Sequence, residues 1–457
     1  ITTLRGTPAV RRTNRAPTEE ETAVPAAGWI PADGPDLWGP LGGPGTHRPK
    51  AHADVRISNM SLILRHLQTS PALSRTRLAR ETGLSKATVS TLVAELCSRG
   101  LLIEEEPDLS GNVGRPSTGL RTAPRTAAGI GLEISGASLL LSVTDLTGEV
   151  VARRCELVDD AGHRPETMIE HVAAMLSQAL EQLTQQGTTV PGIVLAQTGI
   201  IDYTDNTVRY SSTLEWHDVA VADRVRDAVA RRLGPGRSVP TITLENDAKL
   251  AALATYERYA QDGVRNLLYL SGGEGIGAGI ISDGHLLRGW LGLTGEVGHM
   301  PVEPEGLACR CGRRGCWETR SGLQALTSIF PPGDAVRDET TSLDERIELL
   351  RRRFDAGDAE LTRRLELSQR ALARALAILT DVLNPEVIVL SGYLAAFADV
   401  FVSPTASALK DRLLDQRAAV RLETSHLGQW ASSYGAALVA LESVLDNPTL
   451  VDLRPAS

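Results

Sequence analysis

The sequence predicts an α/β protein with a small helical domain on its N-terminal side. Two observations support this: from Ala128 onward short apolar runs alternate with longer amphipathic stretches, and before that point three helical patterns precede two strand-like runs. A chain of 457 residues is also too long for one compact core. We therefore expect a disordered tail at 1–52, rich in Pro, Gly, Ala and Thr, a small domain at 53–124 and a larger domain at 125–457.

The small domain is expected to contain three short helices, each with one apolar face. The first begins near Ser58 and ends before Pro71, the second follows a cap at Ser74 and ends at Gly83, and the third follows a cap at Ser85. Apolar residues recur at helical spacing in the first and third helices: Met60, Ile63, Leu64 and Leu67, then Val89, Leu92, Val93 and Leu96.

The outer face of the third helix is small and polar. It carries Ser85, Lys86, Thr88, Ser90 and Thr91. Such side chains enter the major groove of DNA without collision and donate to phosphates and base edges, as the second helix of a helix-turn-helix does.

A hairpin is expected after the third helix, with strands at 101–103 and near Leu120 around a turn-prone stretch at 107–114. This is the wing of a winged helix-turn-helix. Arg115 lies between a glycine and a proline and is a candidate for contact with the minor groove or with phosphate.

Charge is unevenly distributed along the chain. Residues 56–100 hold seven basic and two acidic side chains, a balance of +5 within a chain of net charge −9, so the remainder carries −14. A basic segment on an acidic body is typical of a nucleic-acid reader joined to a separate sensor. The alternatives are a solvated helix face, or a dimerisation or adaptor module, but the combined pattern favours binding of a double-stranded DNA operator.

The larger domain is expected to alternate strands and helices. Strands are predicted at 129–134 and 137–144, with a turn at 145–148, and a helix from about 165 to 185. Further short buried strands are predicted at 193–196, 241–244, 267–270 and 387–390. No run of 18 apolar residues and no secretory leader is present, so we expect a cytoplasmic protein without a membrane segment.

Four potential metal ligands are close together in the sequence: His299, Cys309, Cys311 and Cys316. Three thiolates and an imidazole complete the tetrahedral shell of a structural Zn²⁺ ion. Free thiols or a disulfide framework are the alternatives, although the chain lacks the profile of a small, cysteine-rich secreted protein. Glu296 and Glu318 flank the cluster, so a metal-held loop would bring two carboxylates together that could bind a polyol.

Several ordered motifs resemble the ROK group of repressors and sugar kinases across residues 56 to about 445. They are Glu245-Asn246-Asp247-Ala248, the glycine-rich stretch 272–279, Thr294-Gly295-Glu296-Val297-Gly298-His299, the cysteine cluster and Asn384-Pro385-Glu386 with the strand after it. The resemblance implies a two-lobed actin-like and hexokinase-like fold, with the C-terminal helix returning to the first lobe. It also implies a homodimer or homotetramer.

The resemblance further implies a sugar site made by Asn246, Asp247, Glu296, His299 and Glu318. The chemistry agrees, because carboxylates accept hydrogen bonds from vicinal hydroxyls and an asparagine amide both donates and accepts. His299 would use one ring nitrogen for the metal and the other for the sugar or a supporting group. A plain network of ion pairs is the alternative interpretation.

The phosphate-binding motifs of the kinases are altered in this chain. Where the family has Asp-x-Gly-Gly-Thr-Lys, this sequence has Glu133-Ile134-Ser135-Gly136-Ala137-Ser138, and where it has Gly-Thr-Gly the sequence has Gly273-Glu274-Gly275. A carboxylate at Glu274 that faced a polyphosphate would cost on the order of 1 to 4 kcal/mol in repulsion. Thr213 stands where the kinases place a sugar-contacting Asn. Asp247 would be the catalytic base of a kinase, but it also serves sugar binding.

The sequence therefore predicts a sugar-responsive transcriptional regulator, a repressor, that controls carbohydrate genes and is not an enzyme. A sugar kinase with a DNA-binding head is the main alternative. A second alternative is a regulator that has lost ligand binding and responds to a protein partner.

Overall fold

The computed structural model describes residues 52–70, 72–105, 119–136, 138–158, 163–338, 341–412 and 420–454. The tail expected at 1–52, apart from its last residue, lies outside these ranges, and so does the tip of the expected wing with Arg115.

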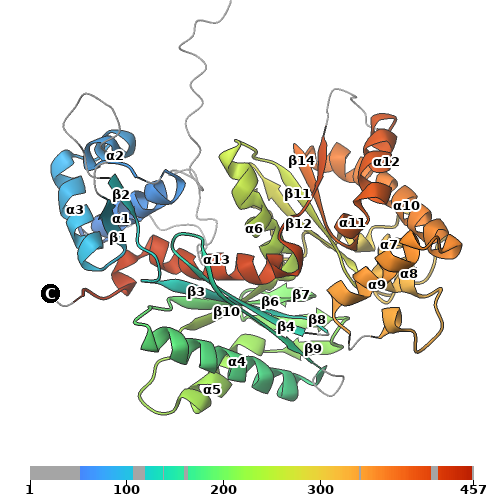
Figure 1. Cartoon of the computed structure of the whole chain (residues 1–457), viewed down its shortest axis with the longest axis horizontal. Coiled ribbons are helices and arrows are strands. Elements are labelled where there is room, and N and C mark those ends of the chain that lie inside the picture. Colours follow the sequence, from blue (N-terminus) through green and yellow to red (C-terminus); the bar gives the residue numbers. More distant parts are fainter. Residues whose placement is uncertain are drawn as a thin grey trace, which may run out of the picture.

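The N-terminal unit, called the head below, contains three helices and one antiparallel hairpin, as predicted (Figure 1). Its elements are α1 (His52–Thr69), α2 (Arg75–Thr82), α3 (Lys86–Ser98), β1 (Leu102–Glu105) and β2 (Gly119–Thr122). Ser74 and Ser85 cap α2 and α3 by accepting from a backbone N–H three residues on, and Gly83 ends α2 with φ of 71°. The predicted apolar faces are buried in one core.

The first lobe is built on a five-stranded sheet of order β10-β6-β3-β4-β5. These strands are β3 (Ala128–Ile134), β4 (Ser138–Asp145), β5 (Val150–Leu157), β6 (Gly192–Gln197) and β10 (Thr241–Asn246). The helices α4 (Pro165–Gln185) and α5 (Val221–Leu233) pack together under one face of the sheet (Figure 1). A small sheet follows β6 in the chain and contains β7 (Ile200–Asp202), β8 (Thr207–Ser211) and β9 (Trp216–Val219).

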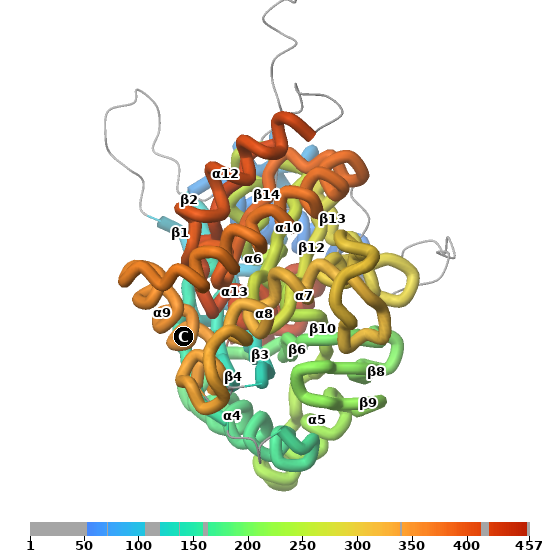
Figure 2. Tube along the Cα trace, turned by 90° about the vertical axis from the view of Figure 1, so that its right-hand side faces the viewer, coloured from blue at the N-terminus to red at the C-terminus, as the bar shows by residue number. Residues whose placement is uncertain are grey.

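The second lobe is built on another five-stranded sheet, of order β13-β12-β11-β14-β15. Its strands are β11 (Leu267–Gly272), β12 (Ile276–Ser282), β13 (His285–Leu286), β14 (Val387–Gly392) and β15 (Arg421–Thr424). α6 (Asp247–Gln261) covers one face, and the other helices cover the face turned to the viewer in Figure 2. Those helices are α7 (Glu318–Ser321), α8 (Leu323–Thr327), α9 (Leu343–Asp355), α10 (Ala359–Leu383), α11 (Tyr393–Ala396) and α12 (Ala398–Lys410). The predicted strands of both lobes are confirmed.

The last long helix, α13 (Ala431–Asp446), returns to the first lobe and packs on β3, β4 and β6, on the face opposite α4. Two glycines of β3 allow this close approach. A Cβ added at Gly129 would lie 2.0 Å from the carbonyl oxygen of Ala437, and one at Gly131 would lie 2.0 Å from that of Ser433. The helix also packs against α6, so it connects the first lobe with the helix that begins at Asp247.

The core of the head continues into the first lobe. Its buried residues form one cluster with Leu441, Val444 and Leu445 of α13 and with Val451 beyond it. Arg65 of α1 adds a polar connection, because its Nη2 donates to Glu442 at 2.6 Å and to Asp446 at 2.5 Å. The head is therefore packed directly on the helix that backs the first lobe. Among the helices that the structure describes, none is long and apolar enough to cross a membrane.

Candidate functional site

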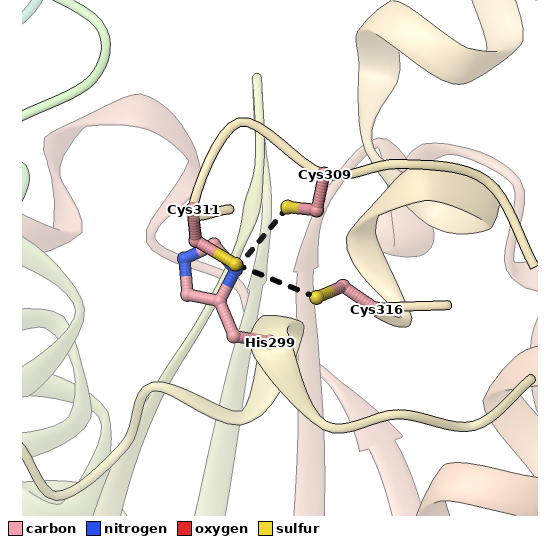
Figure 3. A group of neighbouring side chains, drawn as sticks. All are labelled: His299, Cys309, Cys311 and Cys316. Carbon is pink, nitrogen blue, oxygen red and sulfur yellow. Dashed lines mark hydrogen bonds between the residues drawn. The ribbon is translucent and has the colours of Figure 1, made fainter. Parts of the chain in front are cut away.

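The four predicted metal ligands come together in one cluster (Figure 3). His299 ends the short helix η2 (Val297–His299), Cys309 and Cys311 lie in the following loop, and Cys316 precedes α7. Their ligand atoms all lie within 4.8 Å of one another, with 3.6 Å between Cys309 Sγ and His299 Nδ1 and 3.6 Å between the sulfurs of Cys311 and Cys316. The latter distance is too long for a disulfide. The cluster can hold a metal ion, and its three sulfurs and one nitrogen suit zinc.

Backbone hydrogen bonds fix the shape of the loop that carries Cys309 and Cys311. The N–H of Cys309 donates to the carbonyl of Arg313 at 2.8 Å, and Gly312 and Gly315 have φ of 84° and 71°. A Cβ at Gly315 would lie 1.7 Å from the carbonyl oxygen of Glu303, so only glycine fits there. Burial opposes ionisation of Cys311, but hydrogen bonds from Arg313 and the neighbouring thiols outweigh it and lower its pKa to about 7. Burial instead raises the pKa of the Cys309 and Cys316 thiols, so of the three only Cys311 ionises readily near neutral pH by itself, and a bound metal ion would deprotonate the others.

The three predicted sugar-binding carboxylates each lie at the start of a helix next to this loop. Asp247 begins α6, Glu296 precedes η2 and Glu318 begins α7. Burial raises the pKa of Glu296, and the charges of Asp247 and Glu318 raise it further, which shows that the three groups share one electrostatic environment. Burial likewise raises the pKa of Asp247. The structure thus collects acceptors suited to a polyhydroxylated ligand.

Glu318 is already used in part by the protein. Its Oε2 accepts from the backbone N–H of Ile276 at 3.2 Å, and a Cβ at Gly275 would lie 2.2 Å from that oxygen. The glycine-rich loop between β11 and β12 is therefore packed against the carboxylate. One oxygen of Glu318 therefore holds this loop in place.

Asn246 also has a structural function. Its Oδ1 caps α6 by accepting from the N–H of Lys249 at 3.2 Å, and its Nδ2 donates to the carbonyl of Gly199 at 3.3 Å. The cap fixes the direction in which Asp247 projects, and Thr198 donates to Asp247 Oδ2 at 3.3 Å.

Sequence reasoning missed a buried cation beside these carboxylates. The side chain of Lys249 is 2% exposed, and its Nζ donates to the hydroxyl of Tyr203 at 2.9 Å and to the carbonyl of Gly292. Burial lowers the pKa of Lys249, whereas the charges of Glu245 and Glu296 oppose this. A lysine inside the apolar run that follows Asp247 was the available signal. Lys249 offsets part of the negative charge that the carboxylates concentrate.

The two altered phosphate motifs are engaged within the protein. Burial raises the pKa of Glu133 to about 8, which disfavours its charged form, and its Oε2 has no partner among the described residues. The sequence predicted that the charge of Glu274 would repel a polyphosphate, but in the structure this charge is not uncompensated. It pairs with Arg346 of α9, whose side chain is 3% exposed and also donates to the carbonyl of Val336 at 3.0 Å. The expected repulsion is therefore largely neutralised, and an ion pair occupies this loop instead.

The third helix of the head presents the predicted polar surface. Ser85, Lys86, Ser90 and Thr91 are exposed and Thr88 is half-buried. Ser85 Oγ accepts from the N–H of Thr88 at 3.1 Å and lies 2.8 Å from its hydroxyl. Because Ser85 is the helix cap, the freest side chains on this face are Lys86 and Ser90. The hydroxyl of Thr91 already donates a hydrogen bond to the carbonyl of Ala87.

Comparisons with known proteins agree with this architecture. A model of the ROK family matches residues 129–443, and a model of the MarR family matches residues 61–110. The chain is 25% identical to the xylose repressor of Bacillus subtilis over 87% of this chain and 98% of that protein. It is 28% identical to a glucokinase of Halalkalibacterium halodurans over 60% of this chain and 83% of that protein.

A solved structure shares the whole arrangement. It is the crystal structure of a ROK family transcriptional regulator, described as a homologue of the Escherichia coli MLC protein. The TM-score is 0.68 at 22% identity, and the match covers 86% of this chain and 97% of that one. At this identity the likeness concerns the fold. Because the ROK model covers more than half of the chain, the protein belongs to the ROK family.

Proposed function

We propose that this protein is a sugar-responsive transcriptional repressor of carbohydrate genes that binds double-stranded operator DNA through its head. The observation that carries the proposal is the combination, in one chain, of an exposed polar third helix with a carboxylate site beside a metal cluster. The relative from Bacillus subtilis, matched along nearly its whole length, is named a xylose repressor. Such a regulator acts in the cytoplasm. It would bind DNA as a homodimer or a larger homo-oligomer, because a pseudo-palindromic operator has two half-sites that each bind one head.

The ligand of the proposed site is a monosaccharide held by Asn246, Asp247, Glu296, His299 and Glu318. A structural Zn²⁺ ion bound by His299 and the three cysteines would fix the loop between Glu296 and Glu318. Carboxylates accept from adjacent hydroxyls, and burial strengthens these bonds. The ligand shifts the head only if it binds one arrangement of the protein better than another.

The second candidate is a sugar kinase with a DNA-binding head. It is favoured by the intact Asp247 and by the glucokinase among the relatives. Against it stands the altered stretch 133–138, which lacks the paired glycines, the threonine and the lysine of the kinase motif. Phosphoryl transfer needs the close backbone donors, the hydroxyl and the cation that these residues supply, so we propose that the chain has no kinase activity.

Calorimetry with a sugar panel tests the site. We expect xylose, glucose or N-acetylglucosamine to bind the zinc-loaded protein. Glu296→Gln should lower the affinity for that sugar by roughly 10- to 100-fold, because a charged hydrogen bond contributes about 1.5 to 3 kcal/mol. The matched control is Glu360→Gln on the exposed surface of α10, which should bind normally. Silence of the whole panel would favour a regulator that responds to a protein partner, whereas ADP release with ATP and Mg²⁺ would favour the kinase.

A further inference from the structure

The chain continues past α13 and runs beneath the head in the view of Figure 1. We call residues 447–454 the strap. It begins with the short helix η5 (Pro448–Leu450), which packs against α1, and Asn447 caps η5 by accepting from the N–H of Thr449 at 3.2 Å. Val451 is 3% exposed and belongs to the core of the head. The strap is therefore packed on the head, although it extends from a helix that is packed on the first lobe.

The strap completes the C-terminal end of α3, the helix that presents the polar surface of the head. The last carbonyls of an α-helix have no partner within the helix itself. The carbonyls at 95–97 accept from the backbone N–H groups at 99–101, which follow directly in the chain. The carbonyl of Ser98, the last residue of α3, instead accepts from the backbone N–H of Arg454 at 2.9 Å. A distant part of the chain thus caps this helix.

Side chains hold the strap to the same helix end. Arg99, the first residue after α3, donates through Nη1 to the carbonyl of Val451 at 2.6 Å. Arg454 donates through Nη2 to Thr126 Oγ1 at 2.8 Å, and this hydroxyl donates to the carbonyl of Gly100 at 2.6 Å. A Cβ at Gly100 would collide with the guanidinium of Arg454. Arg454 therefore joins the end of α3, the turn after it and the connection between the head and β3.

The strap is connected to the carboxylate site through α13. This helix packs on β3, β4 and β6 and on α6, whose first residue is Asp247. The contact with α6 is close, because a Cβ at Gly435 would lie 2.1 Å from the carbonyl oxygen of Leu250. Helices packed in this way shift as rigid bodies when lobes rearrange. A movement of α13 would therefore carry the strap with it, and the strap would carry the end of α3.

We propose that the strap positions α3 and transmits the state of the carboxylate site to it, with Arg454 as the central positioning residue. Its N–H prevents the end of α3 from fraying, and its guanidinium fixes the turn that follows. The direction of α3 is then set relative to α13 as well as by the core of the head. The transmission rests on the proposed function, since it requires sugar and DNA binding, whereas the cap does not.

Arg454→Pro tests the cap, because proline has no N–H to donate. In the full-length protein, without sugar or DNA, we expect amide hydrogen exchange at 95–101 to become about fivefold faster or more, which corresponds to the loss of one hydrogen bond. Arg454→Ala keeps the N–H and should show a smaller increase. Arg454→Lys keeps the N–H and a donor for Thr126, so it should exchange as the wild type does. Asp452→Ala, at an exposed position of the strap, is the matched control.

The same variants test the transmission. Arg454→Pro should bind sugar with wild-type affinity, because none of the described contacts of Arg454 involves a proposed sugar-binding residue. The ratio of operator affinities with and without sugar should nevertheless fall by about fivefold or more, measured on operator DNA selected from a random pool. Arg454→Lys and Asp452→Ala should keep the wild-type ratio. Far-ultraviolet circular dichroism should show that every variant is folded.

Two results would overturn the proposal. One is unchanged exchange at 95–101 in Arg454→Pro, and the other is an unchanged effect of sugar on operator affinity in that variant although its helix end exchanges faster. A wild-type protein that binds no sugar or no operator would overturn the transmission together with the proposed function. The exchange experiment would still decide whether the strap caps α3, so the two failures can be told apart.

Discussion

Replacing Cys311 with serine is expected to remove zinc and sugar binding together. A serine hydroxyl is a poor ligand at neutral pH, so the cluster keeps only three donors. Loss of a supporting partner around a metal typically costs 10- to 100-fold in metal affinity, and loss of a ligand itself should cost more. Without the ion, the loop between Glu296 and Glu318 loses its fixed shape, and sugar affinity should fall at least tenfold. Metal analysis by mass spectrometry and sugar calorimetry on the same sample measure both effects.

The matched control is Cys155→Ser. Cys155 is an exposed cysteine of β5 outside the cluster, so this variant should retain one zinc ion per chain and bind sugar normally. A Cys311→Ser protein that kept full sugar affinity without metal would contradict the proposed function of the ion. A wild-type protein purified without metal, and unable to take up zinc, would contradict the site itself.

Reversing the charge of Lys86 is expected to weaken operator binding strongly. Lys86 is exposed in the first turn of α3, beside the helix N-terminus capped by Ser85. Backbone N–H groups and a lysine at such a position attract a DNA phosphate. Lys86→Glu replaces that attraction by repulsion, so we expect a loss of at least tenfold in affinity, measured by fluorescence anisotropy on operator DNA selected from a random pool.

The neutral variant Lys86→Ala tests specifically whether Lys86 contacts a phosphate. If Lys86 contacts a phosphate, the slope of log affinity against log salt should fall by about 1, and the loss should be similar on all sequences. Lys410→Glu, an equal charge reversal on the exposed end of α12 in the second lobe, is the matched control. Equal effects of the two reversals would show that only net charge matters and would contradict a contact through α3.

Local signals in the sequence predicted much of the fold. The caps at Ser74 and Ser85, the turn at Gly83 and the helix at 165–185 depend on neighbours within a few residues, so sequence spacing is sufficient to find them. The same holds for the metal cluster, because three of its four ligands lie within eight residues of one another. Glu296 and Glu318 could be proposed from their positions on either side of the cluster, whereas Asp247 could be proposed only through the family resemblance.

Contacts between distant segments could not be predicted. Glu274 pairs with Arg346, which lies 72 residues further along the chain. Arg65 pairs with Glu442, which lies 377 residues further along. Lys249 was overlooked because its partners, Tyr203 and Gly292, belong to two other segments. Such pairs depend on how the lobes and the head pack, and no spacing rule encodes this.

Sugar in the carboxylate site is expected to change the affinity of the head for DNA. The direct measurement is the dissociation constant for the selected operator with and without a saturating monosaccharide that calorimetry has shown to bind. We expect a change of about 100-fold, which corresponds to about 2.7 kcal/mol of coupling between sugar and DNA binding. Equal operator affinity in the two conditions, with the sugar demonstrably bound, would contradict it.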